Sequence, residues 1–286
     1  MPASTRILVV GATGSVGRGA VAELLARGAR FAAATRDPVR ARSLLGPGVE
    51  LVALDPEDPQ SLAAACEGID ALLLVPPEAA AGRKRSLAQR IAEAAARAGV
   101  RRIALVSGLS AMRDEQSISR EMERDVEALA IAWTFLRPNF FMQNYHTVYR
   151  ESVRRGAIDL FTGAGRTSLV DARDVGAAAA AALLAPGHEG RAPQLTGGEA
   201  LDQAEIAAIL SRATGREVRY TARSHDDTRA ALRAAGLSEA AVEASVARYR
   251  EVEAGGFAAI SPELRELLGR APISFASYAR EHAHHW

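Results

Sequence analysis

The stretch VVGATGSVGRG occupies residues 9–19 and places glycines at positions 11, 14 and 17. It follows an apolar run, Ile7 to Val10, and leads into an amphipathic segment, Val16 to Ala26. A strand, a glycine turn and a helix in this order form the context in which a dinucleotide pyrophosphate binds. Glycine also marks ordinary turns, but the flanking strand and helix favour dinucleotide binding over that alternative.

Each glycine of this motif has its own expected task. Gly11 allows a tight turn, Gly14 lets the backbone approach a phosphate, and Gly17 permits close packing of the helix. The helix N-terminus then presents free N–H groups and a partial positive charge to the anion. We expect the cofactor to be held at this turn by Gly11, Thr13, Gly14, Ser15, Val16 and Gly17.

Apolar runs alternate with segments of helical period up to about residue 140, a pattern typical of βαβ units around a buried parallel sheet. The predicted strands cover residues 6–10, 31–35, 50–54, 71–75, 102–107 and 134–137. Beyond Pro138 the pattern predicts a helix over 140–155, short strands at 158–162, 167–170 and 194–196, and a helix from Ala172. Further predicted helices cover residues 202–214, 226–235, 238–253, 262–268 and 274–283.

The expected fold is therefore α/β: a doubly wound parallel Rossmann sheet with a small, mainly helical C-terminal substrate lobe. We place the dinucleotide-binding domain at residues 1–155, its sheet being completed by later segments near 167–198. Residues 156–286 are expected to form mainly the substrate-binding lobe.

The end of the second predicted strand distinguishes between NAD and NADP. A carboxylate there binds the ribose 2′-OH of NAD, but the sequence has Thr35-Arg36, with Arg40 one helical turn further on. A guanidinium group can hold the 2′-phosphate of NADP, although a solvated surface arginine is the alternative. Asp37 precedes Pro38 and fits a helix N-cap. The pattern favours NADP(H) as cofactor.

The ends of later strands supply the remaining expected cofactor contacts. Asp55 either accepts a hydrogen bond from the adenine amino group or opens a turn in Asp-Pro-Glu-Asp, and the sequence leaves both open. Val75, Pro76 and Pro77 end the fourth strand, where the crevice for the nicotinamide ribose is expected. Ser107 and Pro138 end the fifth and sixth strands at the same edge.

The motifs GATGSVG (11–17), TRDP (35–38), LLLVPP (72–77), ALVSGLSA (104–111), LRPNFFMQN (136–144), VDARDV (170–175) and GRAPISFASYARE (269–281) span nearly the whole chain. Together they resemble the NmrA-like, atypical short-chain dehydrogenase/reductases. Within that family the chain is similar to NADPH quinone oxidoreductases and to festuclavine-dehydrogenase-like reductases. The resemblance implies an extended Rossmann domain and NADPH, but it leaves the substrate open, because the family also includes redox-sensing regulators.

Most short-chain reductases protonate the new alkoxide with a tyrosine whose pKa is lowered by a lysine four residues later. Lys84 is the only lysine of this chain, so no Tyr-x-x-x-Lys pair exists. We therefore expect an NADPH-dependent reductase whose acceptor is electrophilic by itself: an imine, a quinone or a conjugated carbonyl. The main alternative is a non-catalytic NADP(H)-binding redox sensor, and a weaker one is a dehydratase or isomerase.

The candidate catalytic residues are Ser107, Asn139 and Tyr145, each of which offers a hydrogen-bond donor near the carboxyl edge of the sheet. An ordinary structural role is an equal alternative for Ser107 and Asn139. Phe140, Phe141 and Met142, with Tyr145, can form an apolar surface for a flat substrate. The alternative for these four is that they belong to the core.

Composition limits the remaining partner classes. A formal charge of +1 over 286 residues gives no overall field for nucleic acid or membranes, so we expect a small-molecule substrate. Cys66 is the only cysteine, and no apolar run reaches membrane-spanning length, so we expect a cytoplasmic protein. A homodimer is left open. The tail from His282 to Trp286 is interpreted as a solvated helix end with a docked tryptophan, and we expect no metal site.

Overall fold

Seven strands form one parallel sheet. They are β1 (Arg6–Val10), β2 (Arg30–Thr35), β3 (Leu51–Ala53), β4 (Ala71–Leu74), β5 (Arg102–Val106), β6 (Ala132–Pro138) and β8 (Gln194–Leu195). The strands pair in the order β3-β2-β1-β4-β5-β6-β8. This computed structural model describes residues 5–77, 79, 81–234 and 236–286. The predicted parallel sheet is confirmed, and β8 completes it from a later segment of the chain.

The chain forms two compact units. The first comprises Met1–Pro138, Ala172–Leu195 and Glu263–Arg270. The second comprises Asn139–Asp171, Thr196–Pro262 and Ala271–Trp286. The chain thus leaves the sheet unit after β6 and returns to it twice.

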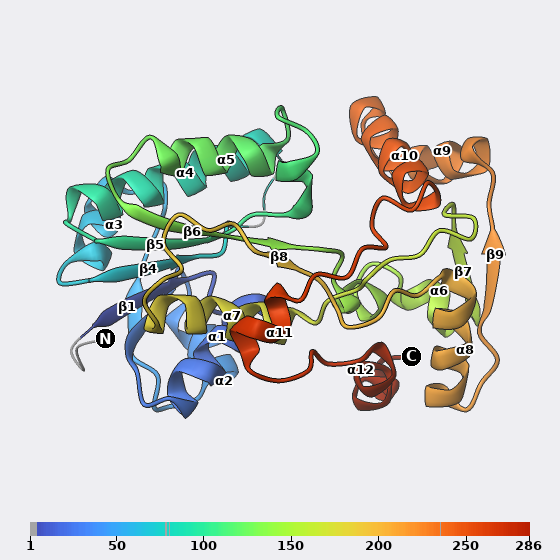
Figure 1. Ribbon diagram of the computed structural model, residues 1–286, viewed down its shortest axis with the longest axis horizontal. Helices are drawn as coiled ribbons and strands as arrows, with labels where there is room; N and C mark the ends of the chain where they lie inside the picture. The colour runs from blue at the N-terminus through green and yellow to red at the C-terminus, as the bar shows by residue number, and fades with distance from the viewer. Residues whose placement is uncertain (1–4, 78, 80, 235) are drawn as a thin grey trace. The chain divides into compact units, whose positions relative to one another are not determined.

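Helices cover both faces of the sheet in the first unit. Their bounds are α1 (Ser15–Ala26), α2 (Pro38–Leu45), α3 (Pro59–Cys66), α4 (Ala81–Arg97), η1 (Leu109–Met112), α5 (Ile118–Glu127), α7 (Ala172–Leu184) and α11 (Glu263–Leu268). Helices α3, α4 and α5 lie on one face, and α1 and α7 lie on the other (Figure 1). Because both faces are covered, the strands are apolar along their whole length rather than at alternate positions.

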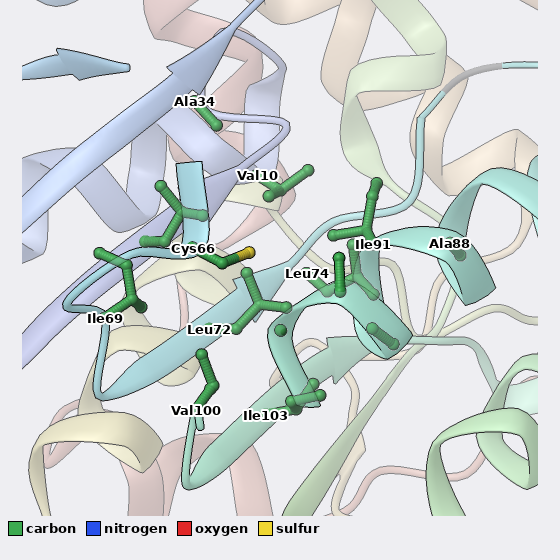
Figure 2. Close-up of a cluster of buried hydrophobic side chains, with 14 of the residues drawn as sticks. Val10, Ala34, Cys66, Ile69, Leu72, Leu74, Ala88, Ile91, Val100 and Ile103 are labelled. Atoms are coloured by element: carbon green, nitrogen blue, oxygen red, sulfur yellow. The ribbon is translucent and has the colours of Figure 1, made fainter. Parts of the chain in front are cut away.

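The core between the sheet and α3 and α4 shows why these strands are so apolar (Figure 2). Leu72, Leu74 and Ile103 project from β4 and β5 toward Ile91 of α4, and each is at most 1% exposed. Cys66, at the end of α3, is completely buried in the same cluster. The thiol therefore behaves as a small core group, as its sequence context indicates.

The second unit contains a two-stranded parallel sheet and mostly helices. Its elements are η2 (Met142–His146), α6 (Arg150–Arg154), β7 (Ala157–Leu160), α8 (Gln203–Thr214), β9 (Arg219–Ala222), α9 (His225–Ala234), α10 (Glu239–Glu253), α12 (Phe275–Glu281) and η3 (Ala283–His285). Strand β7 pairs with β9. Aromatic side chains of Tyr145, Phe275 and Tyr278, each at most 2% exposed, lie in its core.

The predicted helix over 140–155 is wrong. Phe141 is extended and forms a bridge with Val170, because Met142 N donates to Val170 O (2.9 Å) and Val170 N donates to Phe140 O (2.9 Å). These backbone groups are satisfied by a distant segment, so the helix cannot start at residue 140. What remains is the short turn η2 and the single helical segment α6.

Two strand predictions also differ from the structure. Residues 167–170 form no strand but only isolated bridges, Thr167 with Leu201 and Val170 with Phe141. Strand β9 was not predicted, because four residues that are mostly exposed carry no apolar alternation. Both differences depend on which distant segment supplies the hydrogen-bonding partner.

Candidate active site

The glycine turn between β1 and α1 is shaped by contacts that no side chain would permit. Gly11 has a φ of +76°, and a Cβ placed there would lie 2.8 Å from the carbonyl oxygen of Val75. A Cβ on Gly17 would lie 2.1 Å from the carbonyl oxygen of Gly11. Gly14 N donates to that same oxygen (3.1 Å) and closes the turn. Gly11 and Gly17 are therefore required by the packing of the turn itself.

Gly14 has a different role. A Cβ on Gly14 would make only an ordinary 3.4 Å contact with the carbonyl oxygen of Gly11, so the packing of the turn does not require glycine here. The missing side chain instead leaves the N-terminus of α1 accessible. Gly14 is the exposed N-cap of that helix, beside half-buried Thr13 and Ser15, while Val16 turns into the core. The first-turn N–H groups of a helix point outward along its axis, which makes this end suited to an anion.

Two further glycines, which the motif pattern does not mark as functional, allow α1 to pack closely. A Cβ on Gly19 would lie 2.7 Å from Cα of Arg173, and one on Gly176 would lie 2.2 Å from the carbonyl oxygen of Val16. The backbones of α1 and α7 therefore touch directly. The signal was present, since Gly19 ends the opening motif, but its partner lies more than 150 residues further along the chain.

The order of the strands determines where a ligand is expected to bind relative to the turn. Strand β1 lies between β2 and β4, so successive connections leave β1 and β4 in opposite directions, which is the switch point where α/β proteins bind ligands. Val75 N donates to Val10 O (3.2 Å), which sets the end of β4 against Gly11. Pro76 and Pro77 follow, each half-buried. Their expected contact with the nicotinamide ribose stays a prediction.

The end of β2 carries the expected basic pair. Arg36 and Arg40 are exposed, and within the described stretches neither guanidinium group makes a hydrogen bond or ion pair. The Oδ1 of Asp37 accepts a hydrogen bond from Arg40 N (2.9 Å) and caps α2, which confirms the capping interpretation. The carboxylate is thereby engaged, and the guanidinium groups of its neighbours remain available for a phosphate.

Asp55 opens the turn that follows β3. Its Oδ1 accepts from Glu57 N (2.9 Å), and its carbonyl oxygen accepts from Asp58 N (3.1 Å). The turn alternative is thus what the structure displays. The side chain is exposed, and its expected contact with adenine stays a prediction.

Ser107, after β5, belongs to a buried charged network. Its hydroxyl donates to Oε1 of Glu123 (2.7 Å), a residue that is 0% exposed. Arg137 donates two hydrogen bonds to the same carboxylate, from Nε to Oε1 (2.9 Å) and from Nη2 to Oε2 (2.6 Å). A hydroxyl has one proton, so Ser107 in this state accepts, rather than donates, any further hydrogen bond.

Asn139 is used within the second unit. Its Nδ2 donates to Ser168 Oγ (2.8 Å) and to the carbonyl oxygen of Phe257 (3.0 Å), and its Oδ1 accepts from Phe140 N (2.8 Å). The side chain is 4% exposed. In this conformation both amide protons are committed, which matches the structural alternative for this residue, and its catalytic role stays a prediction.

The apolar candidates divide into two pairs. Met142 and Tyr145 are 1% and 2% exposed, and the Tyr145 hydroxyl donates to Gln203 Oε1 (2.8 Å). Burial raises the pKa of Tyr145 far above its usual value, so this phenol is a poor proton donor. Phe140 and Phe141 are only half-buried, Phe140 making an edge contact with Phe257. Of the four, only these two phenylalanines keep accessible surface, and their contact with a substrate stays a prediction.

The model of the NmrA-like family matches residues 3–241 of the chain. The chain belongs to the NmrA-like family. The match confirms the family resemblance drawn from the motifs.

No described helix of this NmrA-like protein is both long and apolar enough to cross a bilayer.

Three relatives support this placement. An NAD(P)H azoreductase of Xenophilus azovorans is 36% identical to this NmrA-like protein over 97% of the chain and 98% of the relative. The NADPH-dependent quinone oxidoreductase QOR2 of Escherichia coli, solved with NADPH, superimposes with a TM-score of 0.85 at 27% identity, covering 96% and 99% of the two chains. The triphenylmethane reductase of Citrobacter sp., solved with NADP(H), gives 0.83 at 26% identity, covering 97% and 99%. The predicted Rossmann fold is confirmed.

Proposed function

We propose that this NmrA-like protein transfers hydride from NADPH to a flat acceptor that is electrophilic without protonation, such as a quinone, an azo compound, an imine or a conjugated carbonyl. The broader class is an NADP(H)-dependent reductase, in line with the relatives of the preceding section. The acceptor class is our inference. One observation carries it: the chain has no Tyr-x-x-x-Lys pair, although the glycine turn between β1 and α1 is intact.

The residues present fit a dinucleotide. The turn around Gly11 and Gly17 has no room for a Cβ, and Gly14 leaves the start of α1 open to a pyrophosphate. Arg36 and Arg40 are exposed at the end of β2, and we assign the 2′-phosphate to them because a guanidinium group pairs well with phosphate. When bound, the cofactor supplies the hydride, and the protein supplies position.

Ser107 is assigned a positioning role in this proposal. Because its proton is donated to Glu123, its oxygen lone pairs can accept a hydrogen bond from the nicotinamide amide. Arg137 holds Glu123 through two hydrogen bonds and thereby fixes the orientation of the serine hydroxyl. In this role the Ser107 hydroxyl would orient the nicotinamide amide and would donate no proton to the acceptor.

The magnitudes agree with such a mechanism. Orientation of two reactants can lower a barrier by about 7 to 11 kcal/mol, whereas a general acid contributes about 10²- to 10⁴-fold in rate. A quinone gives a delocalised oxyanion that water can protonate, and an iminium ion needs no proton in the hydride step. An unactivated ketone gives a localised alkoxide. The loss of the acid therefore affects the ketone most.

The test is an acceptor panel with NADPH in excess: menadione, an azo dye, a cyclic iminium salt and cyclohexanone. We expect kcat/KM for the best activated acceptor to exceed that for cyclohexanone by at least about 10³-fold, the order of the missing acid's contribution. The measurement is NADPH oxidation at 340 nm with product analysis.

Two outcomes would contradict the proposal. Comparable reduction of cyclohexanone would mean that a proton donor is present after all. Tight binding of NADPH without turnover of any acceptor would favour the redox-sensor alternative instead.

A further inference from the structure

Three histidines of the second unit meet in the folded chain. His282 and His285 lie in the C-terminal tail, and His146 ends the turn η2 far earlier in the sequence. One ring nitrogen of each lies within 4.8 Å of the corresponding nitrogens of the other two. All three side chains are half-buried. The C-terminal tail alone does not indicate a metal site, because His146 comes near His282 and His285 only in the folded chain.

The spacing of these nitrogens is close to that of a coordination sphere. Tetrahedral zinc holds imidazole nitrogens about 2.0–2.1 Å away, which places two such nitrogens about 3.3 Å from each other. The ring centroids of His146 and His282, and those of His146 and His285, are 4.8 Å apart. Closing the remaining gap of at most about 1.5 Å requires only small side-chain rotations.

Hydrogen bonds hold the backbone that presents these rings. Arg150 Nε and Arg154 Nε both donate to the carbonyl oxygen of His285 (3.2 and 3.0 Å). Trp286 Nε1 donates to the carbonyl oxygen of Tyr145 (2.7 Å), one residue before His146. The end of the chain is thus tied to the turn that carries the first histidine, and the site is partly assembled before any ion arrives.

Tyr278 provides the outer contact that metal-binding histidines usually have. Its hydroxyl lies in hydrogen-bond contact with Nδ1 of His146, and its ring stacks on the His146 ring with centroids 5.7 Å apart. A polar group at one imidazole nitrogen fixes the tautomer and directs the other nitrogen toward the ion. Coordination by His146 would then use Nε2, with the Nδ1–H group donating to the Tyr278 hydroxyl.

We propose that His146, His282 and His285 bind one divalent transition-metal ion, with Zn²⁺ as the best match and water as the fourth ligand. Three neutral imidazoles suit zinc, copper and nickel and disfavour calcium and magnesium, which prefer oxygen ligands. The ion acts as a clip that ties the C-terminal tail to η2. This site is independent of the proposed reductase function.

The charges around the site affect how it binds. The guanidinium groups of Arg150 and Arg154 lie next to His285, where each donates to the carbonyl oxygen of that residue. The two arginines also repel a cation, which opposes binding. Their repulsion is screened because both side chains reach solvent, whereas three coordinate bonds are short-range.

The experiment uses tag-free, metal-stripped full-length protein titrated with Zn²⁺ against a chelator of known affinity. We expect one ion per chain with a micromolar or lower Kd, and at least about tenfold weaker binding in His146→Ala and His282→Ala. The matched control is His284→Ala, which removes an exposed tail histidine outside the trio and should leave the affinity unchanged. Saturating Zn²⁺ should raise the Tm of wild type and of the control but not of the two trio variants.

A second measurement needs no variant. Co²⁺ should give the intense visible absorption of a four-coordinate site at one equivalent. Absence of that band, or an affinity unchanged by His146→Ala, would overturn the proposal. So would an equal loss in His284→Ala, because that result would indicate binding by the tail alone.

Discussion

At the residue scale, Ser107 shows that the surroundings of a side chain decide which hydrogen bonds it can make. Ser107 was expected to donate a hydrogen bond to the substrate or to the nicotinamide, but its proton is held by Glu123. That carboxylate is completely buried and held by Arg137 at the end of the neighbouring strand β6. The position of Ser107 at the end of a strand was predictable from the sequence. Whether its hydroxyl donates or accepts depends on Glu123, a helix residue that the fold brings beside it.

Arg36 carries the clearest prediction at this scale. Replacing it by aspartate should raise KM for NADPH by about 10- to 100-fold, because a hydrogen-bonded charge pair with the 2′-phosphate contributes about 1.5–3 kcal/mol. NADH has no such phosphate, so its KM should change little. Steady-state kinetics with both cofactors and one activated acceptor measure the difference.

The matched control for this substitution is Arg97→Asp. Arg97 is exposed at the end of α4, which leads into the start of β5 and so lies at the edge opposite the crevice. It should leave both KM values unchanged. Equal loss of NADPH and NADH in Arg36→Asp would refute the 2′-phosphate assignment.

At the scale of elements, the position of α1 depends on direct backbone contact with α7. Gly19 and Gly176 allow it, since a Cβ on either would lie within 2.7 Å of backbone atoms of the other helix. Helix α1 begins at the glycine turn, so its packing also sets the geometry of that turn. Strand and helix periods predicted both helices, but not that their backbones touch, because helical pattern alone does not name the packing partner.

Gly176→Ala tests this contact. The added methyl group would lie 2.2 Å from the carbonyl oxygen of Val16 and 2.4 Å from the nitrogen of Ala20, so α1 must move. We expect the free energy of unfolding in urea to fall by about 1–3 kcal/mol, the usual cost of overpacking, and the affinity for NADPH to fall with it.

Gly48→Ala is the corresponding control. Nothing lies within 4 Å of a Cβ placed on Gly48, and its φ is not in the left-handed region. Its effect should stay within about 0.5 kcal/mol, as for most surface substitutions. If both variants lost the same stability, the close α1–α7 contact would not be the cause.

The whole molecule is built from a chain that leaves the sheet unit after Pro138 and returns to it as α7, β8 and α11. The N-terminal part was predictable because alternating strands and helices repeat within short windows of sequence. The segment around residue 140 was not, since Phe141 pairs with Val170 instead of continuing into a helix. Division into a cofactor domain at 1–155 and a substrate lobe after it stays a prediction as far as those roles are concerned.

The core of the first unit should make stability depend on alkaline pH. Burial raises the pKa of Cys66 from 9.0 to about 11, so the folded state favours the neutral thiol. This contribution is fully present below about pH 9 and is lost as pH rises toward 11. By about pH 10.5 the loss should approach 2 kcal/mol relative to pH 8.

Urea unfolding of wild type and Cys66→Ala at these two pH values isolates the thiol. Buried tyrosines lower alkaline stability in both proteins equally, so the difference between the two curves reports Cys66. We expect the variant to be less stable at pH 8, because it leaves a small cavity, but to lose less on going to high pH. Parallel curves would contradict the buried, neutral thiol.

Local sequence was sufficient for the parallel sheet, the glycine turn, the helix caps and the preference for NADP, because strand period, glycine spacing and capping act between residues that are close along the chain. The buried network of Ser107, Glu123 and Arg137, the contact of Gly19 and Gly176 with the opposite helix, and the meeting of His146 with the C-terminal tail required the folded protein. Each of these joins separate elements, and their approach is set by the packing of all the elements between them. The periodicity of a single sequence does not indicate which elements pack against each other, so these contacts could not be predicted from it.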